Sequence, residues 1–594
     1  QVVHVAAPLP PQQLVPAAHE LVLALGGPND ARLDAAVARD RARASETYLF
    51  AMAENGRLIN ALVDIQRDAG TTWRFAAISG YYLDQLVSIR TPPEPRLMRT
   101  LAENLTSDLV LFRESAAINL AQLLGKIKRR SKASQPQMAV CGRRISLGGG
   151  REIRQTGYAD LCERALAGDA AAACVPYVDS PACGWFVWPQ VTKAYVQPPA
   201  GDATAYDHIE PGSLPAYEAV RSVMFADGKC DEIGRLFSVE GARAPEDDSF
   251  GVLRAALFTQ LFSLFGQPLL DKAWPAIERL ARDNERAGAQ RAAAEVIGGL
   301  LRGSKHWAQD ALAAMWARLV PLLEAVFTKL TPDTLRYWQA GLHYAFARRD
   351  PRRFLPLIRL IVRGNPFNPQ SEAPFGEAAK LELLRVLISA WDWRIASTIV
   401  ASRPRLLDAL AHPYKQVRDA AGIVMYMLSS AEFSVSYPQV DVAIDDLARY
   451  GSTGRDFMHW TGTPRTQALV REMTERVRAW KAEHVPSNEG TSNYSRGSKT
   501  LLTFFIAGFS YSGRRLSVSH IPTVLPLSSV LQEQHDDEEV ARLAKTIMQL
   551  FSQVLYTEDV AQDVATRILD LLGDPSSMWH VVTKTLPLLC TLTF

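Results

Sequence analysis

The chain has 594 residues, and its 65 Lys and Arg against 63 Asp and Glu leave a formal net charge of +2 at pH 7. This length corresponds to about four ordinary domains, unless one repetitive architecture runs throughout. Charge so nearly balanced argues against a protein built wholly around nucleic-acid phosphates. Hydrophobic residues make up 47% and charged residues 22%, which excludes global disorder.

Cysteine usage and apolar runs indicate the compartment. The 6 cysteines are too few for a disulfide scaffold and include no CxxC pair of the kind that binds zinc. The longest apolar runs, such as Phe504–Ala507, are far shorter than the ~20 residues that a membrane span needs. The chain starts at Gln1 rather than Met, has no basic-then-apolar leader, and ends at Phe594 directly after an apolar run. We therefore expect a soluble intracellular piece of a longer protein.

From residue 46 to 125 the apolar spacing predicts paired helices joined by tight turns. Leucine recurs every fourth residue from Leu97 to Leu105, and the same spacing resumes from Phe112 to Leu124. Asp108, which precedes the second run, is the expected N-cap. The preceding residues 1–45 begin with a Pro- and Ala-rich stretch and predict a poorly ordered lead-in.

One pattern recurs along the chain. An arginine is followed by alanine three positions later and then by apolar residues at helical spacing, at Arg113, Arg291 and Arg418. The small alanine lets two helices approach closely, which is typical of the second helix of a HEAT repeat. Because the intervals between the copies are irregular, we expect a degenerate solenoid rather than a tandem consensus array.

We therefore predict an all-α fold, a HEAT-like helical-repeat solenoid (an α-α superhelix) with a small β-hairpin or loop insertion. An acidic run at residues 535–539 is expected to open a late helix, where negative charge suits the helix dipole. The predicted organisation is a lead-in at 1–45, HEAT-like repeats at 46–125, a basic linker and Trp-containing insertion at 126–250, HEAT-like repeats at 251–482, a polar loop at 483–499 and truncated C-terminal HEAT-like repeats at 500–594.

Catalytic motifs do not occur in the sequence. It has no HExxH helix, no GxxxxGK[ST] phosphate loop, no dinucleotide-binding GxGxxG and no GxSxG elbow. Its histidines are scattered rather than clustered. The sequence therefore predicts a non-catalytic protein with no required cofactor and no metal site.

Basic clusters carry the binding hypothesis. They are either solvated helix ends or sites for anions such as phosphorylated small molecules, acidic protein surfaces or nucleic acid. The first basic cluster, at residues 126–132, also has the composition of a nuclear localisation signal. Ser517, which follows two arginines, is a candidate phosphorylation site. The candidate anion-binding residues are Lys126, Lys128, Arg129, Arg130 and Lys132, together with Arg348, Arg349, Arg352 and Arg353.

One stretch resembles a known family. Residues 293–307 read Ala-Ala-Glu-Val-Ile-Gly-Gly-Leu-Leu-Arg-Gly-Ser-Lys-His-Trp and resemble a segment of the proteasome activator complex subunit 4 family, the HEAT-repeat caps of the proteasome core particle. Other similar stretches follow in the family's order, from near residue 60 to the end. The residues that carry the family motifs are Arg302, Gly303, Ser304, Lys305, His306 and Trp307, and in the insertion Trp185, Trp188 and Pro189.

The resemblance implies a non-catalytic regulator that binds the end ring of the core particle. It implies gate opening without ATP, degradation of peptides and unfolded proteins, including acetylated histones, and a link to DNA repair. It also implies nuclear and cytoplasmic pools and inositol polyphosphate bound at basic openings, with no direct nucleic-acid or membrane partner. The chain ends at Leu592-Thr593-Phe594, without the family's Tyr-containing docking tail or its complete acetyl-lysine site, so we expect a fragment from the C-terminal half.

Two other classes of function remain open from the sequence. A HEAT-repeat nuclear transport receptor or phosphatase scaffold would share the solenoid, although the Trp-containing insertion argues against it. An enzyme would need a nucleophile–base pair or a metal cluster, and the sequence motifs show neither.

Overall fold

The computed structural model describes most of the chain from Asn55 onward. Residues 1–45, Trp185, Trp188, Pro189 and Ser517 lie outside the described residues. No helix in the described part is long and apolar enough to cross a membrane. The described residues are 55–128, 144–147, 151–154, 164–174, 177–178, 194–195, 209–239, 249–431, 433–437, 459–462, 464–483, 492–511 and 537–552, with short gaps at 69, 88–90, 365, 392–394, 396–398 and 400–402, and a few isolated positions from 562 to 569.

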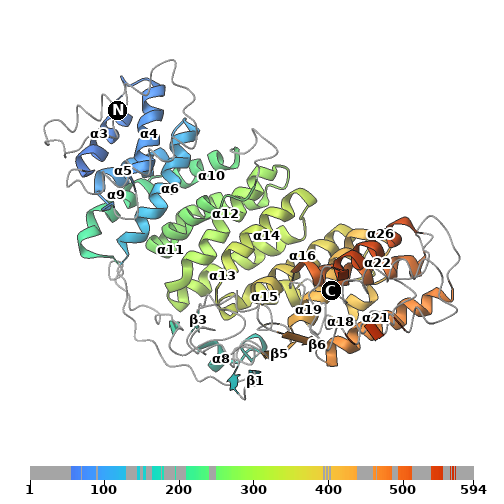
Figure 1. Cartoon of the computed structure of the whole chain (residues 1–594). Helices are drawn as coiled ribbons and strands as arrows, with labels where there is room; N and C mark the ends of the chain where they lie inside the picture. Colours follow the sequence, from blue (N-terminus) through green and yellow to red (C-terminus); the bar gives the residue numbers. More distant parts are fainter. Residues whose placement is uncertain are drawn as a thin grey trace. The chain divides into compact units, whose positions relative to one another are not determined.

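The chain divides into two compact units, and most of their labelled elements are helices (Figure 1). The first unit comprises residues 1–133, 197–322 and 336–345. Its helices are α3 (Asn55–Arg67), α4 (Trp73–Leu86), α5 (Pro95–Asn104), α6 (Val110–Ile127), η3 (Pro211–Ser213), α9 (Leu214–Met224), α10 (Lys229–Val239), α11 (Val252–Arg282), α12 (Ala287–Gly303) and η4 (Ser304–His306), while α13 (Gln309–Phe327) and α14 (Pro332–Phe346) carry residues of both units.

The second unit comprises residues 134–196, 323–335 and 346–594. Its helices are α8 (Ala170–Cys174), η5 (Pro351–Phe354), α15 (Leu355–Arg359), η6 (Leu360–Gly364), α16 (Pro374–Trp391), α18 (Arg403–Asp408), α19 (Lys415–Ala431), α21 (Pro464–Lys481), α22 (Asn493–Tyr511) and α26 (Glu538–Ser552). Its strands are β1 (Arg144–Leu147), β2 (Arg151–Arg154), β3 (Tyr177–Val178), β4 (Ala194–Tyr195), β5 (Phe433–Tyr437) and β6 (His459–Gly462). The predicted helical-repeat fold with a small β insertion is confirmed.

The helix pair α5 and α6 forms as its leucine spacing predicts. Leu97, Leu101 and Leu105 are all buried, because every fourth residue of a helix lies on one face, and α5 packs against both α6 and α9. The predicted N-cap at Asp108 is wrong. Leu109 occupies the N-cap position of α6 without a side-chain cap, and the Leu109 amide donates to the Ser107 hydroxyl instead.

Helix α12 is buried on nearly all sides because its residues are small. It packs against α10, α11 and α14, and the three helices α11, α12 and α14 lie side by side in Figure 1. A Cβ added at Gly299 would lie 2.5 Å from Phe258 Cβ and 2.8 Å from the Ala255 carbonyl oxygen of α11. On the opposite side, a Cβ at Gly298 would lie 3.0 Å from the Gly341 carbonyl of α14. The missing side chains therefore set the spacing of the helices.

Helix α11 consists of two segments joined at a kink. Gly266 has φ 60° and ψ −148°, a conformation that is accessible essentially only to glycine. Pro268 follows directly in the first turn of the second segment, where a proline needs no amide hydrogen bond. The Gly-x-Pro sequence thus converts a continuous apolar stretch into two packed helical segments.

The insertion begins and ends at one point of the first unit. Lys128 and Ile209 form an antiparallel bridge, and the Glu210 amide donates to the Ile127 carbonyl at 2.8 Å. The repeat helices resume at α9, which packs on α5, and continue with α10, which packs on α11 and α12. The insertion therefore spans 129–208, and the predicted limits of 126–250 are corrected, because α9 and α10 belong to the helical repeats.

The insertion contributes strands to a sheet that the sequence did not predict. In the order β2-β1-β5-β6, β1 pairs antiparallel with β2 and parallel with β5, and β5 pairs antiparallel with β6. The predicted repeats at 251–482 therefore contain a two-strand interruption. Within the insertion, β4 at Ala194–Tyr195 falls where strand material was expected and pairs antiparallel with β3, with Tyr177 opposite Tyr195, while the expected strand at Trp185–Pro189 lies outside the described residues.

Two helix starts in the second unit follow local capping. The predicted polar loop at 483–499 is corrected, since α22 already begins at Asn493, where the Ser492 hydroxyl accepts from the Ser495 amide at 3.1 Å. The predicted acidic helix start is confirmed in α26. There Asp537 accepts from the Glu539 and Val540 amides at 2.9 and 3.2 Å.

We predict that Gly299→Ala destabilises the chain, because the new Cβ would lie against backbone and Cβ atoms that cannot swing aside. Overpacking of this kind costs about 1–3 kcal/mol of unfolding free energy. The measurement is thermal or denaturant unfolding of the variant and the parent chain.

Gly376→Ala is the matched control for this prediction. Gly376 also lies in a helix, α16, but an added Cβ there meets no atom within 4 Å. Alanine at this position should be neutral or stabilising by about 0.5–1 kcal/mol. Equal effects of the two substitutions would contradict the packing argument.

Candidate functional site

The family motif at residues 302–307 is a helix junction that holds α11, α12 and α14 together. Arg302 donates to the Tyr344 carbonyl at 2.8 Å and lies 4.7 Å from the centre of the Tyr344 ring. The Trp307 indole N–H donates to the Phe262 carbonyl at 3.0 Å. Gly303 approaches the Thr259 carbonyl so closely that an added Cβ would lie 2.6 Å from it.

Only part of this motif reaches the surface. Ser304 is buried and donates to the Leu301 carbonyl at 3.2 Å. Lys305 is half-buried and His306 is exposed. The motif therefore owes its composition mainly to packing, and His306 is its exposed member.

The recurring arginines are internal hydrogen-bond donors. Arg418 donates to the carbonyls of His412 and Pro413 at 2.7 and 2.9 Å, and Arg113 donates to the Ser107 carbonyl. Arg291 donates to the Phe237 carbonyl of α10 at 2.8 Å. All three arginines are at least 94% buried. Buried polar groups need hydrogen-bond partners, and here the guanidinium groups and the backbone carbonyls supply them to each other.

A buried carboxylate was not found by sequence reasoning. Glu295 is fully buried in α12 and accepts from Arg254 at 2.7 and 2.8 Å and from the Gly251 amide at 2.7 Å. The Arg291 guanidinium lies 3.6 Å from the same carboxylate. The sequence did contain a signal for this ion pair, because a glutamate follows Arg291 at the i+4 position, within the 293–307 stretch that resembles the family.

The first basic cluster is partly used within the fold. Lys126 donates to the Thr91 carbonyl and Lys128 to the Ser263 hydroxyl. Burial lowers the pKa of Lys126 and lowers that of Lys128 to about 8. Both ammonium groups are therefore committed to neighbouring repeats. The other members of the cluster, Arg129, Arg130 and Lys132, lie outside the described residues.

The second basic cluster is divided between interior and surface. Arg348 is exposed and adopts φ 59°, while Arg349 is half-buried. Arg352 is fully buried and paired with Asp350 at 2.8 Å, and Arg353 is 92% buried. The structure thus corrects the expectation that all four present their charge to a solvent anion, because a buried charge cannot do so without leaving its partner.

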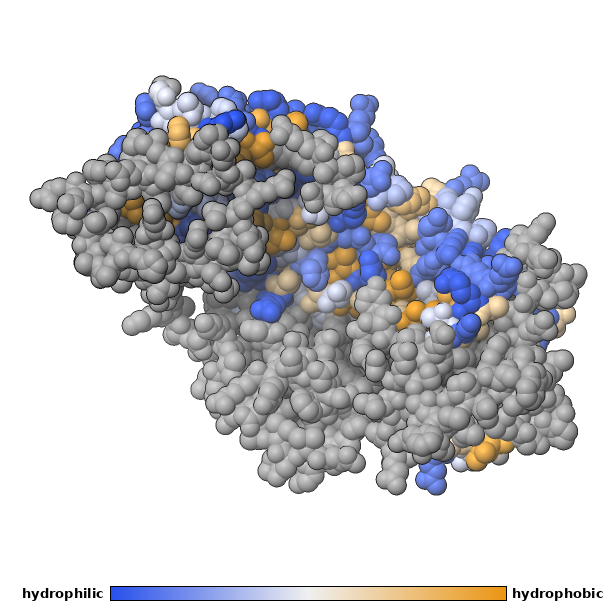
Figure 2. All heavy atoms as spheres, turned by 45° about the horizontal axis from the view of Figure 1, so that its top comes forward, coloured by the Kyte–Doolittle hydropathy of each residue, from blue (hydrophilic) through white to orange (hydrophobic). Residues whose placement is uncertain are grey.

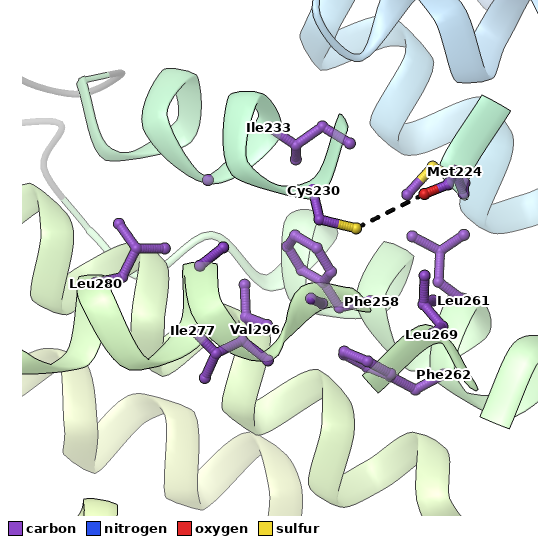
Figure 3. Close-up of a pocket in the computed structure, with 13 residues that line it drawn as sticks. Met224, Cys230, Ile233, Phe258, Leu261, Phe262, Leu269, Ile277, Leu280 and Val296 are labelled. Atoms are coloured by element: carbon purple, nitrogen blue, oxygen red, sulfur yellow. Dashed lines mark hydrogen bonds between the residues drawn. The ribbon is translucent and has the colours of Figure 1, made fainter. Parts of the chain in front are cut away.

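A small apolar cavity lies between α10 and α11 (Figure 3). Its volume is about 30 Å³, and Phe258, Phe262 and Ile277 are among its lining residues. The Cys230 thiol at its edge donates to the Met224 carbonyl at 3.7 Å. Burial, reinforced by the Asp231 carboxylate, raises the pKa of Cys230 to about 11. The thiol therefore packs as an apolar group.

The described surface carries some large apolar side chains. Figure 2 shows hydrophilic and hydrophobic residues intermixed on one face. On α4, Trp73 is 64% exposed and Tyr81 47% exposed, and Arg74 lies 5.5 Å from the centre of the Trp73 ring. No group of three or more His, Cys, Asp or Glu is placed to hold a metal ion within the described ranges.

Comparison with known proteins gives a consistent set of relatives. Residues 96–386 match the family described as proteasome activator complex subunit 4-like, HEAT repeat-like. Proteasome activator complex subunit 4B of Danio rerio is 24% identical over 96% of this chain and 30% of its own length. The Bos taurus and Homo sapiens subunits 4 are 25% and 24% identical over 90% and 93% of this chain and 28% and 29% of theirs. The chain thus spans less than a third of the length of these relatives.

Solved structures of other helical proteins also align with the chain. A structure of Kap95p with RanGDP aligns at 10% identity with a TM-score of 0.34, over 98% of this chain and 67% of that one. A structure of importin beta aligns at 11% identity with a TM-score of 0.27, over 99% and 64% of the two chains.

We predict that Lys128 makes stability depend on pH. Its folded pKa of about 8 lies below the unfolded value of 10.5. Between these values the unfolded chain binds more protons, so stability rises as the pH increases from about 8 to 10. Relative to Lys128→Met, the parent chain should gain roughly 1–2 kcal/mol of unfolding free energy across this window.

Denaturant unfolding of both chains at pH 7, 8, 9 and 10 measures the difference. Lys329→Met, which removes an exposed lysine, is the control and should follow the parent chain at every pH. A constant difference between the parent and Lys128→Met at all four values would contradict the prediction.

We predict that Cys230 reacts slowly with alkylating agents in the folded chain. With its pKa raised to about 11, the thiolate is scarce at pH 8, and labelling should be about 100-fold slower than for an ordinary thiol. Mass spectrometry of the Cys230 peptide after timed iodoacetamide treatment measures the rate. The urea-unfolded chain is the control, and equal rates in the two states would refute the assignment.

Proposed function

We propose that this chain is part of a protein that binds and activates the proteasome. The reason is that residues 96–386 match the proteasome activator complex subunit 4-like HEAT-repeat family. The observation that carries the proposal is the extent of the match. It covers helices α5 to α16 with the motif at 302–307, and relatives named as proteasome activators align with at least 90% of the chain. Because the chain spans less than a third of those relatives, activation is a proposal about the whole protein.

The described architecture suits a structural role in such a regulator. Within each unit the helices stack on one another around buried arginines, and their outer surface can contact a partner without performing chemistry. We therefore propose a non-catalytic regulator that binds the end ring of the core particle and promotes gate opening without ATP. Peptides and unfolded proteins, including acetylated histones, are the proposed substrates of the assembly, in both nucleus and cytoplasm, with a role in DNA repair.

We propose a smaller anion site than the whole second basic cluster. An inositol polyphosphate would need solvent-facing cations, and Arg348 is the exposed member of the second cluster. Lys126, Lys128 and Arg352 already bind groups of the fold. We therefore place any such ligand at Arg348 and Arg349 rather than at the whole cluster.

We predict that the natural protein containing this chain co-purifies with the proteasome core particle and accelerates its hydrolysis of a fluorogenic peptide in the absence of ATP. Co-sedimentation and initial peptidase rates measure the two effects. The core particle alone and the regulator alone are the controls, and the regulator alone should show no turnover.

Other outcomes would support a different function. Absence of both binding and rate change would refute the activator proposal. Capture of a small GTPase or a phosphatase catalytic subunit, without proteasome subunits, would support the transport-receptor or scaffold alternative. Turnover by the regulator free of core particle would indicate an enzyme.

A further inference from the structure

A short segment of the insertion is held on the second unit by arginines. Arg352 of η5 donates to the Ala172 carbonyl at 3.0 Å, and Arg359 of α15 donates to the Ala165 carbonyl at 2.9 Å. Arg359 also donates to the Leu166 carbonyl at 3.3 Å. The acceptors are backbone carbonyls of two short helical turns, whose last carbonyls have few partners within so short a helix. We call residues 164–174 the strap, and Arg352 and Arg359 the arginine latch.

The latch is assembled independently of the strap. Asp350 accepts from the Arg352 side chain at 2.8 and 3.1 Å and from the Arg352 amide at 2.9 Å, and all of these bonds lie within one turn. If the strap moved away, Arg352 would keep its carboxylate partner and lose its bond to Ala172. The open state would therefore leave no unpaired buried charge, which is the usual obstacle to separating such contacts.

The strap contributes a few apolar side chains to the packing. Among its described side chains, the buried ones are Ala165, Leu166 and Ala172, each at most 3% exposed. The second unit has a separate aromatic cluster, in which Phe346 is 4.4 Å from the Trp391 ring and 5.0 Å from the Phe354 ring. Trp391 also donates to the Arg349 carbonyl at 2.9 Å. None of these contacts involves the strap, so this cluster is held by its own contacts.

The repeat helices on either side of the insertion are also joined without the strap. The bridge between Lys128 and Ile209 and the direct packing of α5 on α9 connect them. We propose that residues 164–174 form a strap that the arginine latch holds closed on η5 and α15, and that it opens as a unit while the helices beneath stay folded. Opening exposes Arg352, which converts a buried cation into a surface one.

Hydrogen–deuterium exchange of the full chain tests this proposal. Asp350→Asn combined with Arg352→Met removes both charges, so that no unpaired ion remains to unfold the core. Exchange of the amides in 164–174 should rise about tenfold, as expected from loss of a charge-assisted hydrogen bond, while α16 keeps its protection. Arg359→Met, at an exposed position, should raise exchange in the same peptide by a smaller factor.

Arg363→Met is the matched control, because Arg363 is also exposed and lies one turn beyond Arg359. It should leave exchange of residues 164–174 unchanged. Unchanged exchange of the strap in both latch variants would overturn the proposal. Equal loss of protection in the strap and in α16 would overturn it as well, because the strap would then be part of the core rather than a unit that opens.

Discussion

The first unit depends on the close approach of backbones around α12. Glycines at 298, 299 and 303 bring the backbones of α11 and α14 to distances at which a single added methyl group would collide with main-chain atoms. At this spacing there is little room for side chains between the helices. The buried residues of α12 are therefore rich in alanine and glycine, with a few polar residues that form hydrogen bonds to the neighbouring helices. Gln290 is an example, since its amide donates to the Ala281 carbonyl and accepts from the Trp338 indole, linking α11, α12 and α14.

Buried arginines that face the interior occur in both units. Arg113, Arg291, Arg352 and Arg418 each donate to backbone carbonyls that the helices leave unpaired. Arginine suits this role because its rigid fork of donors stays charged and can serve a carboxylate and a carbonyl together. The net charge of +2 therefore conceals many cations that are committed to the fold, which reduces the basic surface available to ligands.

This use of charge changes how the family resemblance is understood. The segment at 302–307 carries the resemblance to the family, yet Arg302, Gly303 and Trp307 each hold one helix to another. In this chain the segment therefore serves the stacking of helices. The exposed side chains of the same unit, such as His306 and the aromatic residues Trp73 and Tyr81 of α4, are held in place by these packed helices.

The sequence by itself determined the local features of this protein: the helical class, the pair α5–α6, the acidic start of α26 and the repeated arginine pattern. These depend on residue spacing within one or two turns. Only the tertiary structure decided that β1 pairs with β5 across a long stretch of chain, and that Arg352 is interior whereas Arg348 is exposed. Whether a cation faces water depends on which distant carbonyl or carboxylate the fold brings to it, and spacing along the chain does not encode that distance.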